Sequence, residues 1–216
     1  MDTKAIIFDL NGVLIDSNTF NAGLFRKIFA AYSPEAGERA ARHYLHNGGI
    51  PRRKRMEMYL RDFARVEPDE REVQKVLDKF SELLHAGLKD IPLKGCVREF
   101  LQENYGKYRF FVASGAVVQD AEKVLKAKGI YDFFERVYGS PEPKHLHVAD
   151  IMREYGYRNN ELVFFGDSVH DKAAADKAGV RFVAVKSAEN DWKGYEPKID
   201  DFCEEKVLQR ILGDIR

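Results

Sequence analysis

Polar side chains that could bind a ligand follow three short apolar segments of the chain. Asp9, Ser114 and Asp167 stand at these positions, and a glycine lies close to each of them. Carboxylate oxygens suit hard metal ions, and glycine lets the backbone approach a ligand closely. Any one of the three residues alone would be interpreted as a helix N-cap or a turn residue. Because all three occur in the same setting, we predict a metal-binding carboxylate cluster built around Asp9.

The segments that precede these residues have the character of buried strands. They are residues 4–9, 109–113, 162–165 and 182–185, with 136–138 as a weaker candidate. Their apolar residues run continuously instead of alternating, which is typical of strands covered on both faces of a parallel sheet. Amphipathic helices are expected between them; Val97, Phe100, Leu101 and Tyr105, for example, share one helical face.

This alternation of strands and helices predicts an α/β fold with a doubly wound parallel sheet of five main strands. Ligands of such sheets bind at the carboxyl ends of the strands, so side chains that are far apart in sequence can converge there. Residues 17–90 interrupt the alternation, because they contain no strand candidate. We expect four helices in this stretch, near 18–31, 35–46, 52–65 and 69–88, with hinges at Gly12 and at residues 91–95.

Four segments together resemble the motifs of the haloacid dehalogenase-like (HAD) superfamily. They are residues 8–17 (FDLNGVLIDS), 111–115 (FVASG), 139–144 (GSPEPK) and 166–171 (GDSVHD). They occur in the family's order on the predicted strands, and the resemblance covers essentially the whole chain. It implies a Rossmann-like core formed by residues 1–16 and 92–216, and a helical cap formed by residues 17–91.

The resemblance also implies chemistry for particular residues. Asp9 would be a nucleophile that attacks phosphorus and forms an aspartyl-phosphate, which water then hydrolyses. Mg²⁺ would offset the charge repulsion between carboxylate and phosphate; its implied ligands are Asp9, Asp167, Asp171 and the backbone carbonyl of Asn11. The implied phosphate-binding groups are Lys144, the hydroxyl of Ser114 and nearby backbone N–H groups, among them that of Gly115. Lys144 could also be a solvated lysine, and Asp171 could stabilise the start of a helix.

Asn11 departs from the family's pattern. Phosphatases of the family have a second Asp at this position, which protonates the leaving oxygen and later activates water. A carboxamide cannot exchange a proton in this way. Asn11 could therefore mark a slow or specialised hydrolase, a binding or regulatory protein that kept the fold, or an engineered substitution. His145 and His147 could be imagined as a replacement acid, but we expect them to be ordinary helix-surface residues.

The predicted cap contains a basic segment, residues 47–55 (NGGIPRRKR). It resembles a cap loop in which a Gly-x-x-Arg sequence presents arginine to the substrate. Arg52 is the best match and Arg53 the second, and a solvated basic helix start is the alternative. Asn21 aligns more weakly with a position that contacts substrate in such caps.

The composition excludes some classes of partner. Lys and Arg together number 35, and Asp and Glu also number 35, so no global field attracts nucleic acid or a membrane surface. Cys96 and Cys203 are the two cysteines of the chain, and we expect both to be reduced thiols in a cytoplasmic protein. The apolar run at residues 5–8 is too short for a signal sequence or a membrane span.

The sequence thus predicts a Mg²⁺-dependent hydrolase of a small phosphorylated metabolite. Three alternatives stay open: a catalytically weakened binding or regulatory protein, a phosphosugar mutase, and a dehalogenase. A mutase needs acid/base catalysis twice, which suits Asn11 badly. A dehalogenase needs no metal, which leaves the pair Asp167 and Asp171 without a purpose. The identity of the substrate and any protein partner are not readable from the sequence.

Overall fold

The computed structural model describes residues 3–47, 50–187 and 190–213. Its centre is a six-stranded sheet in the order β3-β2-β1-β4-β5-β6, in which every paired strand is parallel to its neighbour. The strands are β1 (Ala5–Phe8), β2 (Arg109–Val117), β3 (Phe134–Ser140), β4 (Leu162–Gly166), β5 (Arg181–Val185) and β6 (Lys198–Ile199). The predicted doubly wound α/β fold is therefore confirmed.

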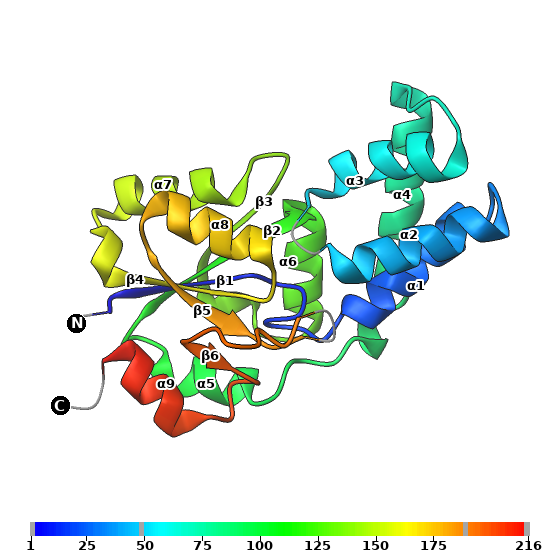
Figure 1. Ribbon diagram of the computed structural model, residues 1–216. Coiled ribbons are helices and arrows are strands. Elements are labelled where there is room, and N and C mark those ends of the chain that lie inside the picture. Colours follow the sequence, from blue (N-terminus) through cyan, green and yellow to red (C-terminus); the bar gives the residue numbers. More distant parts are fainter. Residues whose placement is uncertain (1–2, 48–49, 188–189, 214–216) are drawn as a thin grey trace.

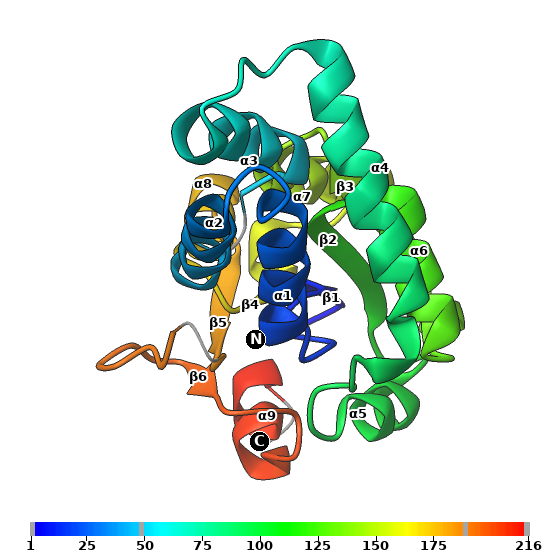
Figure 2. The same cartoon turned by 90° about the vertical axis from the view of Figure 1, so that its right-hand side faces the viewer.

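Helices cover both faces of the sheet (Figures 1 and 2). Side chains alternate between the faces along a strand, so Ile6 and Phe8 join one apolar cluster while Ala5 and Ile7 join another. The helices of the first face are α5 (Val97–Asn104), α6 (Val118–Ala127) and α9 (Glu205–Leu212), and those of the second are α7 (Lys144–Tyr155) and α8 (Val169–Ala178). Burial on both faces explains why the strand segments are continuously apolar.

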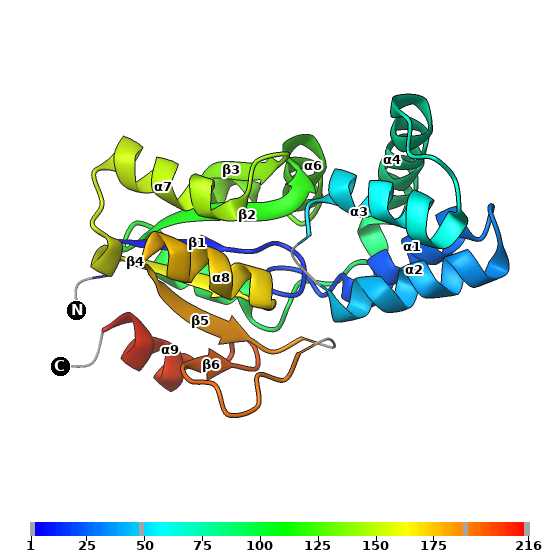
Figure 3. The ribbon, with the colours of Figure 1, turned by 45° about the horizontal axis from the view of Figure 1, so that its top comes forward.

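The stretch between β1 and β2 is helical, as the sequence predicted. Its helices are α1 (Asn18–Phe29), α2 (Pro34–His46), α3 (Arg52–Tyr59), which continues as a π-helical turn (Leu60–Ala64), and α4 (Glu70–Ala86). They lie together beyond one end of the sheet (Figure 3). Aromatic rings of Phe25, Phe29, Tyr59 and Phe80 pack against one another among these helices.

The two chain segments that join these helices to the sheet lie side by side. The backbone N–H of Asp16 donates to the carbonyl of Pro92 at 3.0 Å, and that of Lys94 donates to the carbonyl of Leu14 at 3.0 Å. The chain thus leaves and re-enters the α/β part at one place, close to the hinges predicted from the sequence. We propose the division already given, with residues 17–91 as the cap.

Several local predictions were incomplete. β2 extends past Ser114 to Val117, and the two-residue β6 adds a sixth strand. α5 ends at Asn104, so Tyr105 does not share its buried face and is 64 % exposed. His147 is not a helix-surface residue, because it is buried and its ring packs against that of Tyr138 in β3, with the ring centroids 5.2 Å apart.

The prediction of two reduced cysteines was wrong. Cys96 and Cys203 form a disulfide that joins the start of α5 to the segment before α9. Sequence spacing could not reveal this, because 107 positions separate the two residues and only the fold brings their Cα atoms to 5.0 Å. The expectation of a cytoplasmic location stays a prediction, and reduced thiols no longer support it. None of the described helices combines the length and apolarity needed to cross a membrane.

Candidate active site

The sheet topology places Asp9 and Asp167 next to each other. β1 and β4 are hydrogen-bonded neighbours with Phe8 opposite Phe165, so the residues that follow them emerge together at the same edge. The backbone N–H of Asp9 donates to the carbonyl of Phe165 at 2.9 Å. The direction of the strand order reverses between β1 and β4, which is where parallel α/β sheets form their ligand crevice.

A third carboxylate completes a buried cluster. Asp9, Asp167 and Asp171 each present an oxygen within 4.8 Å of the others, and all three residues are buried. The chain must pass closely at Gly12, which has a φ of +79°; a Cβ there would lie 2.1 Å from Oδ2 of Asp167. Glycine is therefore required at position 12 both by conformation and by space.

Lys144 lies among these carboxylates, at the first position of α7. Its Nζ is 2.8 Å from Oδ1 of Asp9 and 2.5 Å from Oδ1 of Asp171. Oδ2 of Asp171 accepts hydrogen bonds from the hydroxyl and the backbone N–H of Ser168, so both oxygens of this carboxylate are engaged. Asp171 and Ser168 together form a capping box at the start of α8.

The charges of the cluster do not balance. Three carboxylates and one ammonium group leave two negative charges in a buried site. Burial, with a further contribution from the charge of Asp171, raises the pKa of Asp9 to about 6 although Lys144 opposes the shift. The two carboxylates raise the pKa of Lys144 against the effect of its burial, so the lysine stays charged. A divalent cation fits this set of oxygen donors and this excess of negative charge.

Ser114 and Gly115 lie beside the cluster, within the last four residues of β2. Ser114 is fully buried, and its Oγ accepts a hydrogen bond from the backbone N–H of Ala116 at 3.1 Å. Gly115 lines a pocket together with Asp9 and Lys144. Ser114 lines an adjoining hollow that Gly115 and Lys144 share.

The side chain of Asn11 is held by neighbours from the first helix of the cap and the residue before it. Its Oδ1 accepts hydrogen bonds from Oγ of Ser17 at 2.6 Å and from Nδ2 of Asn21 at 3.0 Å. Asn18, the first residue of α1, donates from Nδ2 to Oδ2 of Asp167 at 2.9 Å. Sequence reasoning missed Asn18, because a lone asparagine at a helix start has no distinguishing pattern.

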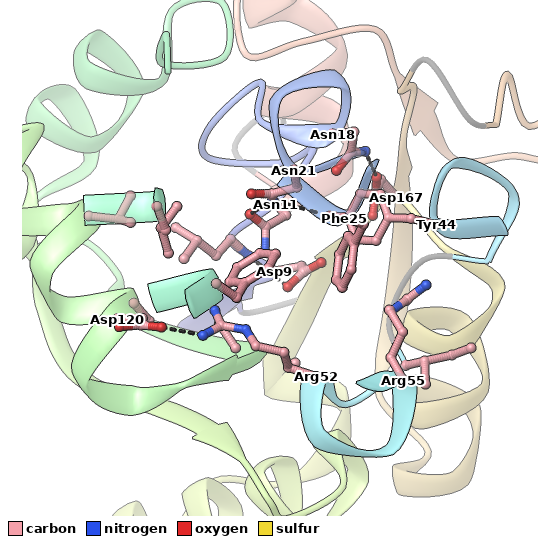
Figure 4. Close-up of a pocket in the computed structure, with 18 of the residues that line it drawn as sticks. Asp9, Asn11, Asn18, Asn21, Phe25, Tyr44, Arg52, Arg55, Asp120 and Asp167 are labelled. Carbon is pink, nitrogen blue, oxygen red and sulfur yellow. Dashed lines mark hydrogen bonds and ion pairs between the residues drawn. The ribbon is translucent and has the colours of Figure 1, made fainter. Parts of the chain in front are cut away.

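The pocket lies between the carboxylate cluster and the cap helices (Figure 4). The cavity has a volume of about 60 Å³, which suits a small ligand. Arg52 reaches it from α3, but its guanidinium is paired with Asp120 of α6 and covers the ring of Phe80. Arg55, one turn further along α3, also lines the pocket and was not singled out from the sequence. Gly48 and Gly49 of the predicted cap loop lie outside the described residues.

Comparisons with known proteins agree with this arrangement. Pyrophosphatase PpaX of Halalkalibacterium halodurans is 25% identical over 195 residues, which cover 86% of this chain and 84% of that protein. Phosphoglycolate phosphatase of Pectobacterium atrosepticum is 27% identical over 195 residues, covering 84% and 80% of the two chains. The structure of CbbY from Rhodobacter sphaeroides in complex with phosphate superposes with a TM-score of 0.74 at 21% identity, covering 94% of this chain and 96% of that one.

A family model described as haloacid dehalogenase-like hydrolase matches residues 6–185. The matched region begins in β1 and ends with β5, so it contains all four motifs and the helical stretch between β1 and β2. The chain therefore belongs to the haloacid dehalogenase-like hydrolases.

Proposed function

We propose that this protein is a Mg²⁺-dependent phosphatase that hydrolyses a small phosphorylated metabolite through an aspartyl-phosphate on Asp9. The observation that carries the proposal is the placement of Asp9 against Lys144, with Asp167 and Asp171 beside it in a buried site. Two relatives of the chain are named for phosphate-releasing activities, phosphoglycolate phosphatase and pyrophosphatase. The small pocket agrees with a small substrate.

In this proposal the metal ion is held by Asp9, Asp167 and the backbone carbonyl of Asn11. Asp171 binds the ion directly or through a water molecule. The cation, when bound, reduces the repulsion between the Asp9 carboxylate and an incoming phosphate dianion. Asp171 has a second task within the protein, because it fixes Nζ of Lys144 at 2.5 Å. Lys144 is thereby held at a defined place where it can neutralise an oxygen of the transferred group.

The two chemical steps follow from these positions. A carboxylate oxygen of Asp9 attacks phosphorus, and the bond to the leaving oxygen breaks with its electron pair moving to that oxygen. Water then attacks the aspartyl-phosphate, which releases inorganic phosphate and restores Asp9. Lys144, the hydroxyl of Ser114 and the backbone N–H of Gly115 bind the phosphoryl oxygens in both steps.

Asn11 limits the rate of both steps in this proposal. It cannot give a proton to the leaving oxygen or take one from the attacking water. General acid/base catalysis contributes about 10²–10⁴-fold, or roughly 3–5 kcal/mol of barrier. Substrates that leave well without a proton, such as acyl phosphates, lose least, so the protein is expected to act slowly on ordinary esters.

The test measures phosphate release from a panel of phosphorylated metabolites plus acetyl phosphate, with Mg²⁺ and with a chelator. We expect release that requires Mg²⁺ and disappears in Asp9→Asn. Unchanged turnover in Asp9→Asn, or in the presence of the chelator, would contradict the proposal.

A second candidate function, that of a binding or regulatory protein, is favoured by the inability of Asn11 to exchange a proton. Its amide is fixed by two hydrogen bonds in a position where a phosphatase of this family needs a titrating group. Tight binding of Mg²⁺ and a phosphorylated ligand without any phosphate release, even from acetyl phosphate, would decide for this candidate.

A further inference from the structure

Arg55 differs from the other cations that line the pocket containing Asp9. The charge of Lys144 is matched by Asp9 and Asp171, and that of Arg52 by Asp120. Arg55 is only 2% exposed, yet it forms no ion pair with any Asp or Glu in the described ranges 3–47, 50–187 and 190–213.

The groups that hold the Arg55 side chain in place are neutral. Its Nη2 donates to the carbonyl of Asn47 at 2.6 Å and its Nη1 to the hydroxyl of Tyr59 at 3.3 Å. Its guanidinium lies over the ring of Tyr44, 4.8 Å from the centroid. Burying a charge without a counter-charge is costly. These contacts orient the guanidinium but leave its charge uncompensated, which is the state expected of a group that awaits an anion.

A second polar group in the same part of the pocket also lacks a partner. Oδ1 of Asn21 is buried and accepts no hydrogen bond from the part of the protein that the structure describes. Nδ2 of the same side chain donates to the hydroxyl of Tyr44 at 3.1 Å, and Tyr44 is the residue on which Arg55 stacks. Figure 4 shows Asn21, Tyr44 and Arg55 bordering the pocket that contains Asp9.

We propose that Arg55 determines specificity by binding a second anionic group on the leaving group of the substrate. This inference rests on the proposed phosphatase function. Lys144 binds the phosphoryl group that is transferred, and Arg55 binds a carboxylate or a second phosphate at the other end of the molecule. Arginine offers several N–H groups in one plane, which suits either anion. A hydroxyl of the leaving group would donate to Oδ1 of Asn21.

The experiment compares three small substrates in the presence of Mg²⁺. Phosphoglycolate carries a carboxylate, ethane-1,2-diyl bisphosphate carries a second phosphate, and ethyl phosphate carries neither. The ratio of kcat/KM for each anionic substrate to that for ethyl phosphate is measured in the wild type, in Arg55→Met and in Arg55→Lys. Arg61→Met is the matched control, because Arg61 is an exposed arginine of the cap helices paired with Asp62.

A hydrogen-bonded charge contributes about 1.5–3 kcal/mol, which corresponds to roughly 10–150-fold. We therefore expect Arg55→Met to lower the ratio at least tenfold, Arg55→Lys to lower it less, and Arg61→Met to leave it as in the wild type. The anionic substrate whose kcat/KM ratio falls more in Arg55→Met identifies the preferred anion as carboxylate or phosphate. An equal loss for all three substrates would show that Arg55 is only structural and would overturn the inference.

A binding measurement separates this inference from the proposed function. Calorimetry with Mg²⁺ on Asp9→Asn, and on Asp9→Asn combined with Arg55→Met, reports recognition without turnover. We expect Arg55→Met to weaken binding of the anionic ligands at least tenfold more than binding of ethyl phosphate. If Arg55→Met loses this preference but still hydrolyses phosphate esters, the role of Arg55 in binding the second anionic group is supported. If hydrolysis does not depend on Asp9, the proposed function is contradicted, and the inference about Arg55 is not.

Discussion

Asn11 is the residue at which the site differs most from what phosphate-ester hydrolysis needs. We predict that Asn11→Asp raises kcat for phosphate esters by about 10²–10⁴-fold, because it supplies a group that can exchange a proton. Acetyl phosphate should gain much less, because its leaving group needs little protonation. Steady-state phosphate release from both kinds of substrate measures the effect. An unchanged rate with esters would show that position 11 does not limit catalysis.

Lys144 is predicted to hold the site together as well as bind phosphate. Lys144→Met removes the cation that lies between Asp9 and Asp171, and breaking a buried ion pair costs roughly 3–5 kcal/mol. Urea unfolding without Mg²⁺ should show this loss, and added Mg²⁺ should restore part of it. Lys172→Met is the control, because Lys172 pairs with Asp176 near the surface. Equal, small losses in both variants would contradict the role given to Lys144.

At the scale of residues, the sequence predicted which side chains lie close together where a motif marks their positions. Asp9, Asp167, Asp171 and Lys144 were all named from their motifs, and the structure places them together. Arg55 was not named, because one arginine in a run of four basic residues has no signal of its own. Only the contacts show that Arg52 is paired with Asp120 while Arg55 has no carboxylate partner among the described residues.

At the scale of elements, one buried ion pair joins the cap helices to the sheet region. Asp120 of α6 forms an ion pair with Arg52 of α3. Its carboxylate is also hydrogen-bonded to two residues of α4, to Oγ of Ser81 at 2.8 Å and to Nε2 of His85 at 2.7 Å. Burial alone would raise the pKa of Asp120, but the charge of Arg52 and these hydrogen bonds hold it below its usual range. The ionised carboxylate thus contributes to the docking of α3 and α4 on α6.

We predict that Asp120→Asn lowers the free energy of unfolding by about 3–5 kcal/mol at neutral pH, because Arg52 stays buried without its partner. A lowered native pKa stabilises the fold above the ordinary value of 3.8, and this contribution is lost as the pH falls through the native pKa. The difference between wild type and variant should therefore shrink in acid. Urea unfolding over a pH series measures it, and a difference that does not change with pH would contradict the assignment.

The helices of the cap could be predicted closely, because their apolar residues repeat with helical period and their limits carry signals. Ser33 and Asp69 cap α2 and α4 with their side chains, as their types suggest. β6 could not be predicted, because two residues are too short for any periodic pattern. Its position follows only from pairing with β5, which is a tertiary interaction.

For the whole molecule, the order of the strands is what turns four separate motifs into one site. The sequence predicted strands and their order along the chain, but the neighbours β1 and β4 follow from the sheet topology. The disulfide between Cys96 and Cys203 shows the same limit, since its partners meet only after folding. Long-range proximity was predicted correctly only where the family's motifs implied it.

We predict that the disulfide contributes about 2–4 kcal/mol to stability, because it closes a long loop in the unfolded chain. Urea unfolding should shift to lower urea in the presence of a reductant. Cys203→Ser should have the reduced protein's stability and should not respond to the reductant. Thiol titration of the denatured, unreduced protein should find no free thiol, and two free thiols would contradict the assignment.

The central claim is that Asp9 accepts the phosphoryl group. The most direct measurement mixes the protein with acetyl phosphate and Mg²⁺, stops the reaction in acid within the first turnover, and locates the modification by peptide mass spectrometry. Our account predicts one phosphoryl group on the peptide that contains Asp9, and no such group with a chelator or in Asp9→Asn. Phosphate release without any phosphorylated Asp9 peptide, or a phosphoryl group on another residue, would contradict it.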